Sequence, residues 1–85
     1  MAKSIYTPSH KIVIDTLIKA RKDVGVYQEN LAEKIGKSQP FVSTYERGQR
    51  NISFVEFVVI ARALGYDPAE LAAEVIRQLP ADIEI

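Results

Sequence analysis

Apolar residues recur at intervals of three and four positions along most of this chain, the spacing that gathers side chains on one face of a helix. The first such segment opens at Thr7-Pro8 and ends before Gly25. Thr7 is a good N-cap, and Pro8 suits the first helical position, where its missing N–H costs nothing. The pattern therefore predicts a helix over residues 8–24.

Capping residues and glycines divide the rest of the chain into four more helices. Ser53 and Glu56 have the spacing of a capping box, and Asp67 and Glu70 repeat it. The predicted helices cover residues 28–35, 39–47, 53–64 and 68–79. No segment longer than three residues alternates cleanly between apolar and polar, although the tail at 83–85 could be extended. The expected fold class is all-α, a compact five-helix bundle.

Length and composition indicate a single folded domain. The 85 residues are 47% hydrophobic and 26% charged, as in a typical globular chain. We expect an N-terminal arm over residues 1–7, the domain over 8–77 and a C-terminal tail over 78–85. The longest apolar run, 57–61, is too short to span a bilayer, and the N-terminus lacks the apolar stretch of a secretory signal. A cytoplasmic protein is therefore expected.

The residue types that catalysis and metal binding require are scarce. The chain has one His, no Cys and no glycine-rich phosphate loop, so it offers neither a nucleophile with its base nor thiolate ligands. We expect no enzymatic activity, no cofactor and no metal site.

Charge is unevenly distributed, although the formal net charge is zero. Residues 1–51 hold nine Lys or Arg against five Asp or Glu, whereas residues 52–85 hold two against six. This polarity predicts one positive face that meets an anionic partner and a second face with a different role. Chance is the alternative explanation.

Two short helices joined by the turn at 36–38 have the spacing of a helix-turn-helix. In the second helix, Val42 and Tyr45 are expected to face the core. The outward side chains of that helix are the candidates for contacts with DNA bases: Gln39, Pro40, Phe41, Ser43 and Thr44. Short hydrogen-bonding side chains on a projecting helix suit base edges in the major groove, and the alternative is an ordinary solvated face.

Cationic and amide side chains surround this candidate face, where phosphates would run. The candidate phosphate contacts are Lys37, Ser38, Arg47, Arg50 and Asn51, to which the family resemblance described below adds Gln28. For Arg47 and Arg50 the alternative is an exposed charge near a helix C-terminus, where the helix dipole favours cations. Tyr27 is expected to be a packing residue.

A longer pattern of residues resembles the Cro/repressor-type, xenobiotic-response-element-like helix-turn-helix family of phage repressors and bacterial regulators. The matching positions are Arg21, Gly25, Gln28, Leu31, Ala32, Gly36, Ser38, Gln39, Val42, Ser43, Glu46 and Gly48, followed by residues 60–65. The resemblance covers roughly residues 9–77. It implies a five-helix domain of the phage-repressor type that binds operator DNA as a dimer, with the helix at 39–47 in the major groove.

The resemblance also implies roles for individual residues. Gln28 would bind a phosphate and support Gln39, which would contact a base, and Arg21 and Glu46 would form a structural salt bridge. Pro40 and Phe41 depart from the polar residues common in the family. We expect them to contact thymine methyls or sugars through van der Waals forces.

The predicted helix at 53–64 is more apolar than a one-sided helix needs. Val55 and Val59 point away from the set that the family buries, which is Phe54, Phe57, Val58, Ala61 and Leu64. We expect a homodimer interface formed by Val55, Val59, Leu71, Val75, Leu79, Ile83 and Ile85, the alternative being that the last helix and tail cover their own core. Two recognition helices would then lie about 34 Å apart and require a palindromic operator.

The sequence thus predicts a transcriptional regulator, acting as a repressor, that binds double-stranded DNA as a homodimer. One alternative is a DNA-binding antitoxin of a toxin-antitoxin pair. A second alternative is a protein-interaction module that has lost DNA binding and binds a protein through its apolar helices. The protein partner considered for the chain is a toxin or another regulator. The polar face flanked by cations favours DNA binding, because an interaction module has no need of it.

Overall fold

Five helices make up the regular structure of the computed structural model, which describes residues 8–83. They are α1 (Pro8–Asp23), α2 (Gln28–Lys34), α3 (Gln39–Glu46), α4 (Phe54–Ala63) and α5 (Pro68–Gln78). Each end lies within one residue of its predicted position, and no strand occurs among the described residues. The all-α prediction is confirmed. The expected N-cap at Thr7 and the expected arm at 1–7 lie outside the described residues, as do Glu84 and Ile85.

The predicted capping box at the start of α4 is present in full. Glu56 N donates to Ser53 Oγ over 3.1 Å, and Ser53 N donates to Glu56 Oε1 over 2.8 Å. At the start of α5, Asp67 is the N-cap residue, as expected, but no capping box forms. Asp67 Oδ1 accepts from Ala69 N over 2.9 Å, one residue earlier than a capping box requires. The prediction of a second capping box with Glu70 was therefore wrong.

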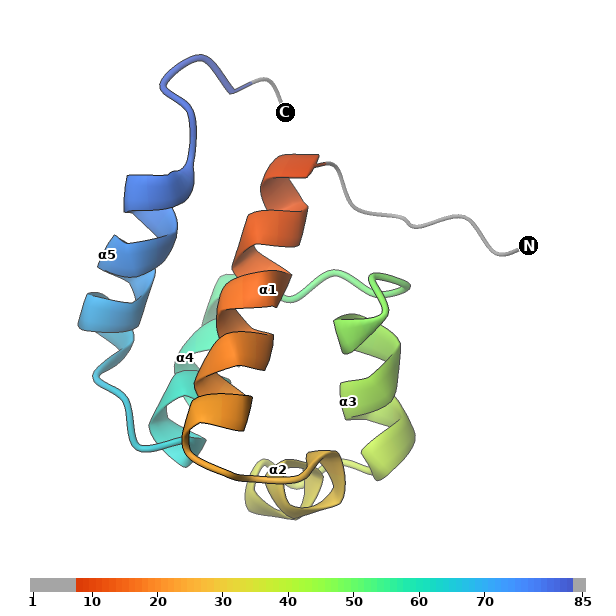
Figure 1. The fold of residues 1–85 in the computed structure, drawn as a ribbon. Helices are drawn as coiled ribbons and strands as arrows, with labels where there is room; N and C mark the ends of the chain where they lie inside the picture. The colour runs from red at the N-terminus through yellow and green to blue at the C-terminus, as the bar shows by residue number, and fades with distance from the viewer. Residues whose placement is uncertain (1–7, 84–85) are drawn as a thin grey trace.

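The longest helix, α1, runs through the middle of the molecule (Figure 1). In that view α5 lies on one side of α1 and α3 on the other, with α4 behind and α2 across the lower end. The largest fully buried side chains are Tyr45, Ile14, Leu17, Leu31, Ile60 and Val42. Every helix except α5 contributes to this set, and α5 adds Leu71 and Val75 to the core. No helix in the described part of the chain is long and apolar enough to cross a membrane.

Two of the residues expected in a dimer interface belong to the core instead. Leu71 and Val75 are each only 6% exposed, because the apolar stripe of α5 packs against α1 and α4. Leu79 is half-buried against the same core. For these three residues, the alternative that α5 covers its own core is the better description.

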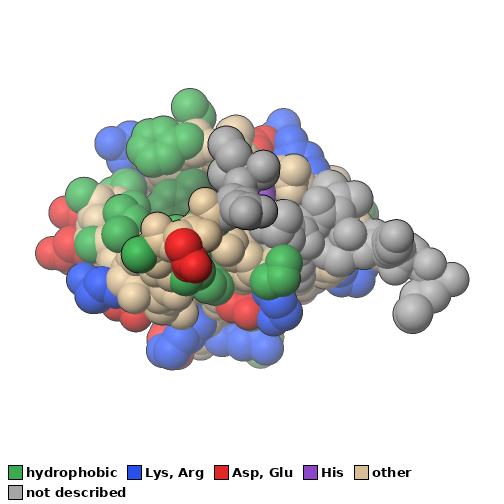
Figure 2. All heavy atoms as spheres, turned by 90° about the horizontal axis from the view of Figure 1, so that it is seen from above, with side chains coloured by type: hydrophobic (Ala, Val, Ile, Leu, Met, Phe, Trp, Pro, Cys, Tyr) green, Lys and Arg blue, Asp and Glu red, His purple; other side chains and the backbone are tan. Residues whose placement is uncertain are grey.

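Other apolar side chains remain at the surface. Val55 is 69% exposed, Val59 43% and Ile83 36%. Phe54, which we expected to be buried, is 77% exposed because it borders an open groove between α1, α4 and α5. Seen from above, apolar side chains gather toward the α4 and α5 side of the molecule (Figure 2).

Candidate nucleic-acid interface

A four-residue link, residues 35–38, joins α2 to α3, and its backbone N–H groups satisfy carbonyls at the end of α2. Gly36 has φ of +72°, a conformation that suits a residue without Cβ. Gly36 N donates to Glu33 O over 3.2 Å, and Lys37 N donates to Ala32 O over 2.9 Å. Ala32 is 2% exposed where the two helices pack. The short turn and this close packing fix how α3 projects from the rest of the bundle.

The side chains of α3 divide into a core face and an outer face. Val42 and Tyr45 are fully buried, as predicted. The outer face, as we use the term below, consists of Gln39, Pro40, Ser43, Thr44 and Arg47, all exposed or half-buried. These residues present amide, hydroxyl and guanidinium groups beside the apolar ring of proline.

Phe41 lies on the flank of α3 rather than on the outer face. It is half-buried against the core, and its ring meets that of Tyr45 edge-on with 5.9 Å between centroids. The reason is helical geometry, because residues four apart share a face and Tyr45 points inward. The structure therefore packs the Phe41 ring partly against the core.

A chain of hydrogen bonds runs from the core to the outer face. Arg21 and Glu46 form a two-bond ion pair, with 2.8 Å from Arg21 Nε to Glu46 Oε2 and 2.9 Å from Arg21 Nη2 to Glu46 Oε1. Gln28 Nε2 donates to Glu46 Oε1 over 2.8 Å, and Gln39 Nε2 donates to Gln28 Oε1 over 2.8 Å. Gln28 thus ties α2 directly to α3 at both ends of α3, and Arg21 ties α1 to the same unit.

The buried ion pair determines which atoms donate and which accept along this series of hydrogen bonds. The Arg21 and Glu46 side chains are 10% and 7% exposed. The hydrogen bonds that Arg21 donates to Glu46 raise the pKa of Arg21 against the opposing effect of burial. Because an ionised carboxylate only accepts, Gln28 presents its NH₂ group to Glu46 and its oxygen to Gln39. Gln39 must then donate, which leaves its Oε1 and a second N–H for a ligand.

A second charged cluster lies beside α3, on the side of Phe41. Arg50 Nη1 and Nη2 donate to Glu56 Oε1 and Oε2 over 3.0 and 2.8 Å, and Arg50 Nη1 also donates to Asn51 O over 2.9 Å. The Arg50 guanidinium carbon lies 4.6 Å from the centroid of the Phe41 ring, and Lys37 Nζ lies 5.4 Å from it. Phe41 is therefore a platform for two cations.

Electrostatics make the Arg50–Glu56 pair persistent. Hydrogen bonds from Arg50, followed by that from the Ser53 backbone, lower the pKa of Glu56 from its ordinary 4.5 to about 2. The same contact raises the pKa of Arg50. The pair is consequently ionised at all physiological pH values. The sequence identified Glu56 only as a capping residue, since no local spacing rule connects residues 50 and 56.

The remaining candidate phosphate contacts lie on the outer face or around it. Lys37, Ser38 and Asn51 are exposed, and Ser38 holds the N-cap position of α3 without a side-chain capping bond. Arg47 is exposed and donates through Nη1 to Ser43 Oγ. Since that oxygen accepts from Arg47, the hydroxyl hydrogen of Ser43 is available to another acceptor.

Tyr27 is a surface residue that the sequence led us to misjudge. We expected it to pack, but it is 72% exposed. It lines a shallow hollow with Gln28 and Gln39 at the N-terminal ends of α2 and α3. No pattern in the sequence around Tyr27 distinguishes a packed tyrosine from an exposed one.

Among residues 8–83, no group of three or more His, Asp or Glu side chains could hold a metal ion.

Comparisons with known proteins agree with this arrangement. A family model described as Helix-turn-helix (HTH_3) matches residues 17–71. An uncharacterized HTH-type transcriptional regulator of Sinorhizobium fredii is 34% identical over 61 residues, which are 72% of this chain and 79% of the relative.

Solved structures of similar proteins share the fold. An XRE-family like protein from Pseudomonas syringae pv. tomato is 32% identical with a TM-score of 0.79, over 85% of this chain and 88% of that one. The restriction-modification controller protein C.AhdI from Aeromonas hydrophila is 34% identical with a TM-score of 0.66, over 78% of this chain and 99% of that one.

Proposed function

Because the chain belongs to the Helix-turn-helix (HTH_3) family of DNA-binding transcriptional regulators, we propose that α3 enters the major groove of an operator and reads its bases. The observation that carries this proposal is the hydrogen-bond chain from Arg21 to Gln39. It holds an exposed glutamine amide on the outer face and leaves one acceptor and one donor of that amide free. A side chain oriented before binding loses less entropy on binding.

The chemistry of the outer face suits an adenine near a thymine. An amide with one outward oxygen and one outward N–H can pair with the N6 amino group and the N7 of adenine. Ser43 and Thr44 can donate to or accept from neighbouring bases, and the Pro40 ring can contact a thymine methyl. Phe41 lies on the flank of α3, and its part in this interface would be to position Lys37 and Arg50, which lie over its ring.

Groups on and around the outer face would hold the DNA backbone. Arg47, Lys37, Ser38 and Asn51 would contact phosphates, and the remaining N–H of Gln28 would do the same at the start of α2. Tyr27, an exposed residue beside Gln28, would add a further hydroxyl donor. These contacts would position the protein without adding sequence preference.

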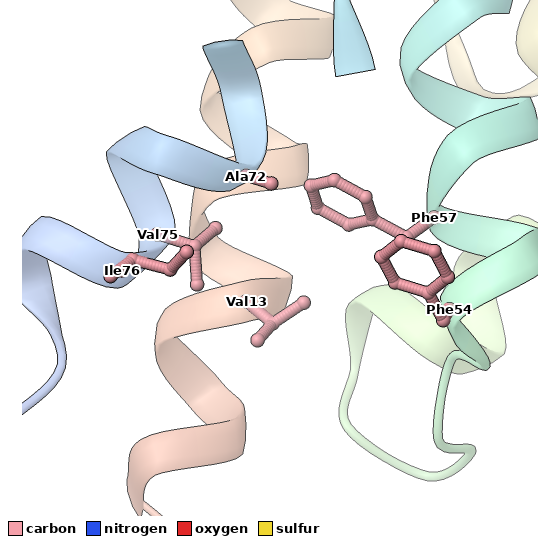
Figure 3. A pocket seen from close by; sticks show the side chains of 6 residues that line it. All are labelled: Val13, Phe54, Phe57, Ala72, Val75 and Ile76. Carbon is pink, nitrogen blue, oxygen red and sulfur yellow. The ribbon is translucent and has the colours of Figure 1, made fainter. Parts of the chain in front are cut away.

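We further propose that the protein acts as a homodimer on a palindromic operator. A groove of about 220 Å³ opens between α1, α4 and α5, lined by Val13, Phe54, Phe57, Ala72, Val75 and Ile76 (Figure 3). Phe54 and Ile76 at its edge are 77% and 67% exposed, and Val55 and Val59 extend the apolar surface. A two-fold axis would bring the same surface of each chain together. The exposed part of the proposed interface is therefore Phe54, Val55, Val59 and Ile76, with Leu79 and Ile83 at its margin.

Occupancy of an operator by such a dimer would repress transcription by excluding other proteins from the site. A restriction-modification controller is among the similar structures, which supports a regulatory role. The same apolar surface supports a second candidate, in which a toxin or another regulator covers it and the chain acts as an antitoxin.

Stoichiometry on DNA tests the proposal. Sedimentation of the protein with a duplex that it binds should give two chains per duplex. Binding of a single chain to a duplex that contains one half-site at equal affinity would contradict the homodimer, and absence of binding by folded protein would contradict the DNA-binding role.

A further inference from the structure

Glu56 makes an unusual set of contacts for an acidic residue beside a DNA-binding surface. Its two carboxylate oxygens accept hydrogen bonds from both terminal nitrogens of Arg50. One of those oxygens also accepts from Ser53 N, as part of the capping box that starts α4. The capping box thus fixes the Glu56 carboxylate independently of Arg50. A carboxylate in a fixed position holds the guanidinium in one place.

The position of Arg50 is fixed from two further directions. Its guanidinium lies over the ring of Phe41 on the flank of α3, and its Nη1 donates to the backbone oxygen of Asn51. These bonds leave the Nε–H and one Nη2–H of Arg50 without an acceptor among the described residues. A cation in this position can donate to one phosphate while its charge is largely compensated.

A carboxylate and a phosphate compete for the same guanidinium donors, because both accept them two at a time. The Arg50 and Glu56 side chains are 40% and 28% exposed, so phosphates can reach the pair. An unpaired arginine binds the backbone of any duplex, since phosphate contacts carry no sequence information. Pairing with Glu56 removes much of that indiscriminate attraction.

We propose that Glu56 is a specificity-determining residue of the DNA interface, which holds Arg50 above Phe41 and withdraws it from the phosphates of non-operator DNA. This inference rests on the proposed DNA-binding function. Glu56 acts through Arg50 and needs no contact with DNA. On the operator, where α3 is seated in the groove, Arg50 meets one phosphate through its remaining N–H groups. Elsewhere the pair keeps non-specific binding weak.

The variant Glu56→Gln tests this role without removing the helix cap, because glutamine also serves in capping boxes. Affinity for a non-operator duplex should rise, by up to about eightfold at 0.1 M salt, since one added phosphate contact contributes a salt slope of about 0.9. The slope of log affinity against log salt should steepen by the same 0.9, and the ratio of operator to non-operator affinity should fall.

Two controls separate this effect from a change in net charge. Glu70→Gln removes the same formal charge from α5, which lies on the opposite side of α1 from α3 (Figure 1), and should change affinity much less. In a protein that already carries Arg50→Gln, Glu56→Gln should raise the affinity for a non-operator duplex by no more than Glu70→Gln does. Circular dichroism confirms that each variant is folded.

The outcomes distinguish the inference from the function on which it rests. If wild-type protein binds duplex DNA and Glu56→Gln behaves like Glu70→Gln, the role of Glu56 is overturned and DNA binding stands. The role is also overturned if the gain survives in the Arg50→Gln background. If folded wild-type protein binds no duplex at about 50 mM salt, both the inference and the proposed function fail.

Discussion

Gln39 on α3 donates a hydrogen bond to Gln28 on α2, with 2.8 Å between Gln39 Nε2 and Gln28 Oε1. The direction of this bond is set by Glu46, a buried acceptor that takes the NH₂ group of Gln28. An ion pair in the core therefore determines which atoms of Gln39 face outward. The core and the proposed recognition surface are parts of one hydrogen-bonded unit.

Replacing Gln39 tests the proposed base contact. Gln39→Ala should weaken binding to the operator by about 1 to 3 kcal/mol and relax the preference at one base pair, because a bidentate contact contributes that much discrimination. Fluorescence anisotropy against operators substituted at each position measures both effects. Gln49→Ala, which removes an exposed glutamine from the loop after α3, is the matched control. Equal base preference in wild type and Gln39→Ala would assign the contact to another residue.

Breaking the buried ion pair should destabilise the fold. Glu46→Ala leaves Arg21 with a buried, unpaired charge, so the free energy of unfolding should fall by about 3 to 5 kcal/mol. Urea denaturation measures this difference. The control is Asp23→Ala, which breaks the exposed pair between Lys19 and Asp23 and should cost at most about 1 kcal/mol. Similar losses in the two variants would mean that the Arg21–Glu46 pair contributes no more than a surface pair.

The sequence predicted those features that depend on neighbours along the chain. Helix ends followed from local residues, such as the Ser53–Glu56 capping box and the positive φ of Gly36. The Arg21–Glu46 pair came from the family resemblance, since 25 residues separate its members. Local reasoning could not have supplied it.

The features that the sequence did not predict depend on how the helices pack. Phe41 appeared to face outward, but the inward direction of Tyr45 places it on the flank of α3. Leu71 and Val75 could have faced a second chain or their own core, and only the docking of α5 on α1 decides between them. The Arg50–Glu56 pair spans a loop, whose path no periodicity describes.

The Arg50–Glu56 pair should make stability depend on pH in acid. The pKa of Glu56 is lowered to about 2 in the folded protein, below its ordinary 4.5. Its contribution is therefore complete above pH 4.5 and is lost as the pH falls toward 2. The free energy of unfolding of Glu56→Gln should lie below that of wild type at pH 7, and the difference should shrink through this window. Urea denaturation at several pH values measures it, and a constant difference from pH 7 to pH 2 would contradict the lowered pKa.

An exposed phenylalanine offers a direct test of the proposed dimer. Phe54→Ser should raise the dissociation constant of the dimer at least tenfold, because burying one phenylalanine in each chain contributes about 1.5 to 3 kcal/mol per side chain. Analytical ultracentrifugation over a range of concentrations measures the constant. Val24→Ser is the control, since Val24 is 44% exposed between α1 and α2, outside the apolar surface of α4 and α5. A dissociation constant unchanged by Phe54→Ser would place the interface elsewhere.

The most direct test of sequence-specific DNA binding is selection of bound duplexes from a random DNA pool, followed by measurement of affinity for the selected sequence against salt concentration. We predict a palindromic sequence with half-sites about one helical turn apart, bound with an affinity that falls steeply as salt rises. If folded protein enriches no sequence at about 100 mM salt, the outer face of α3 does not read DNA.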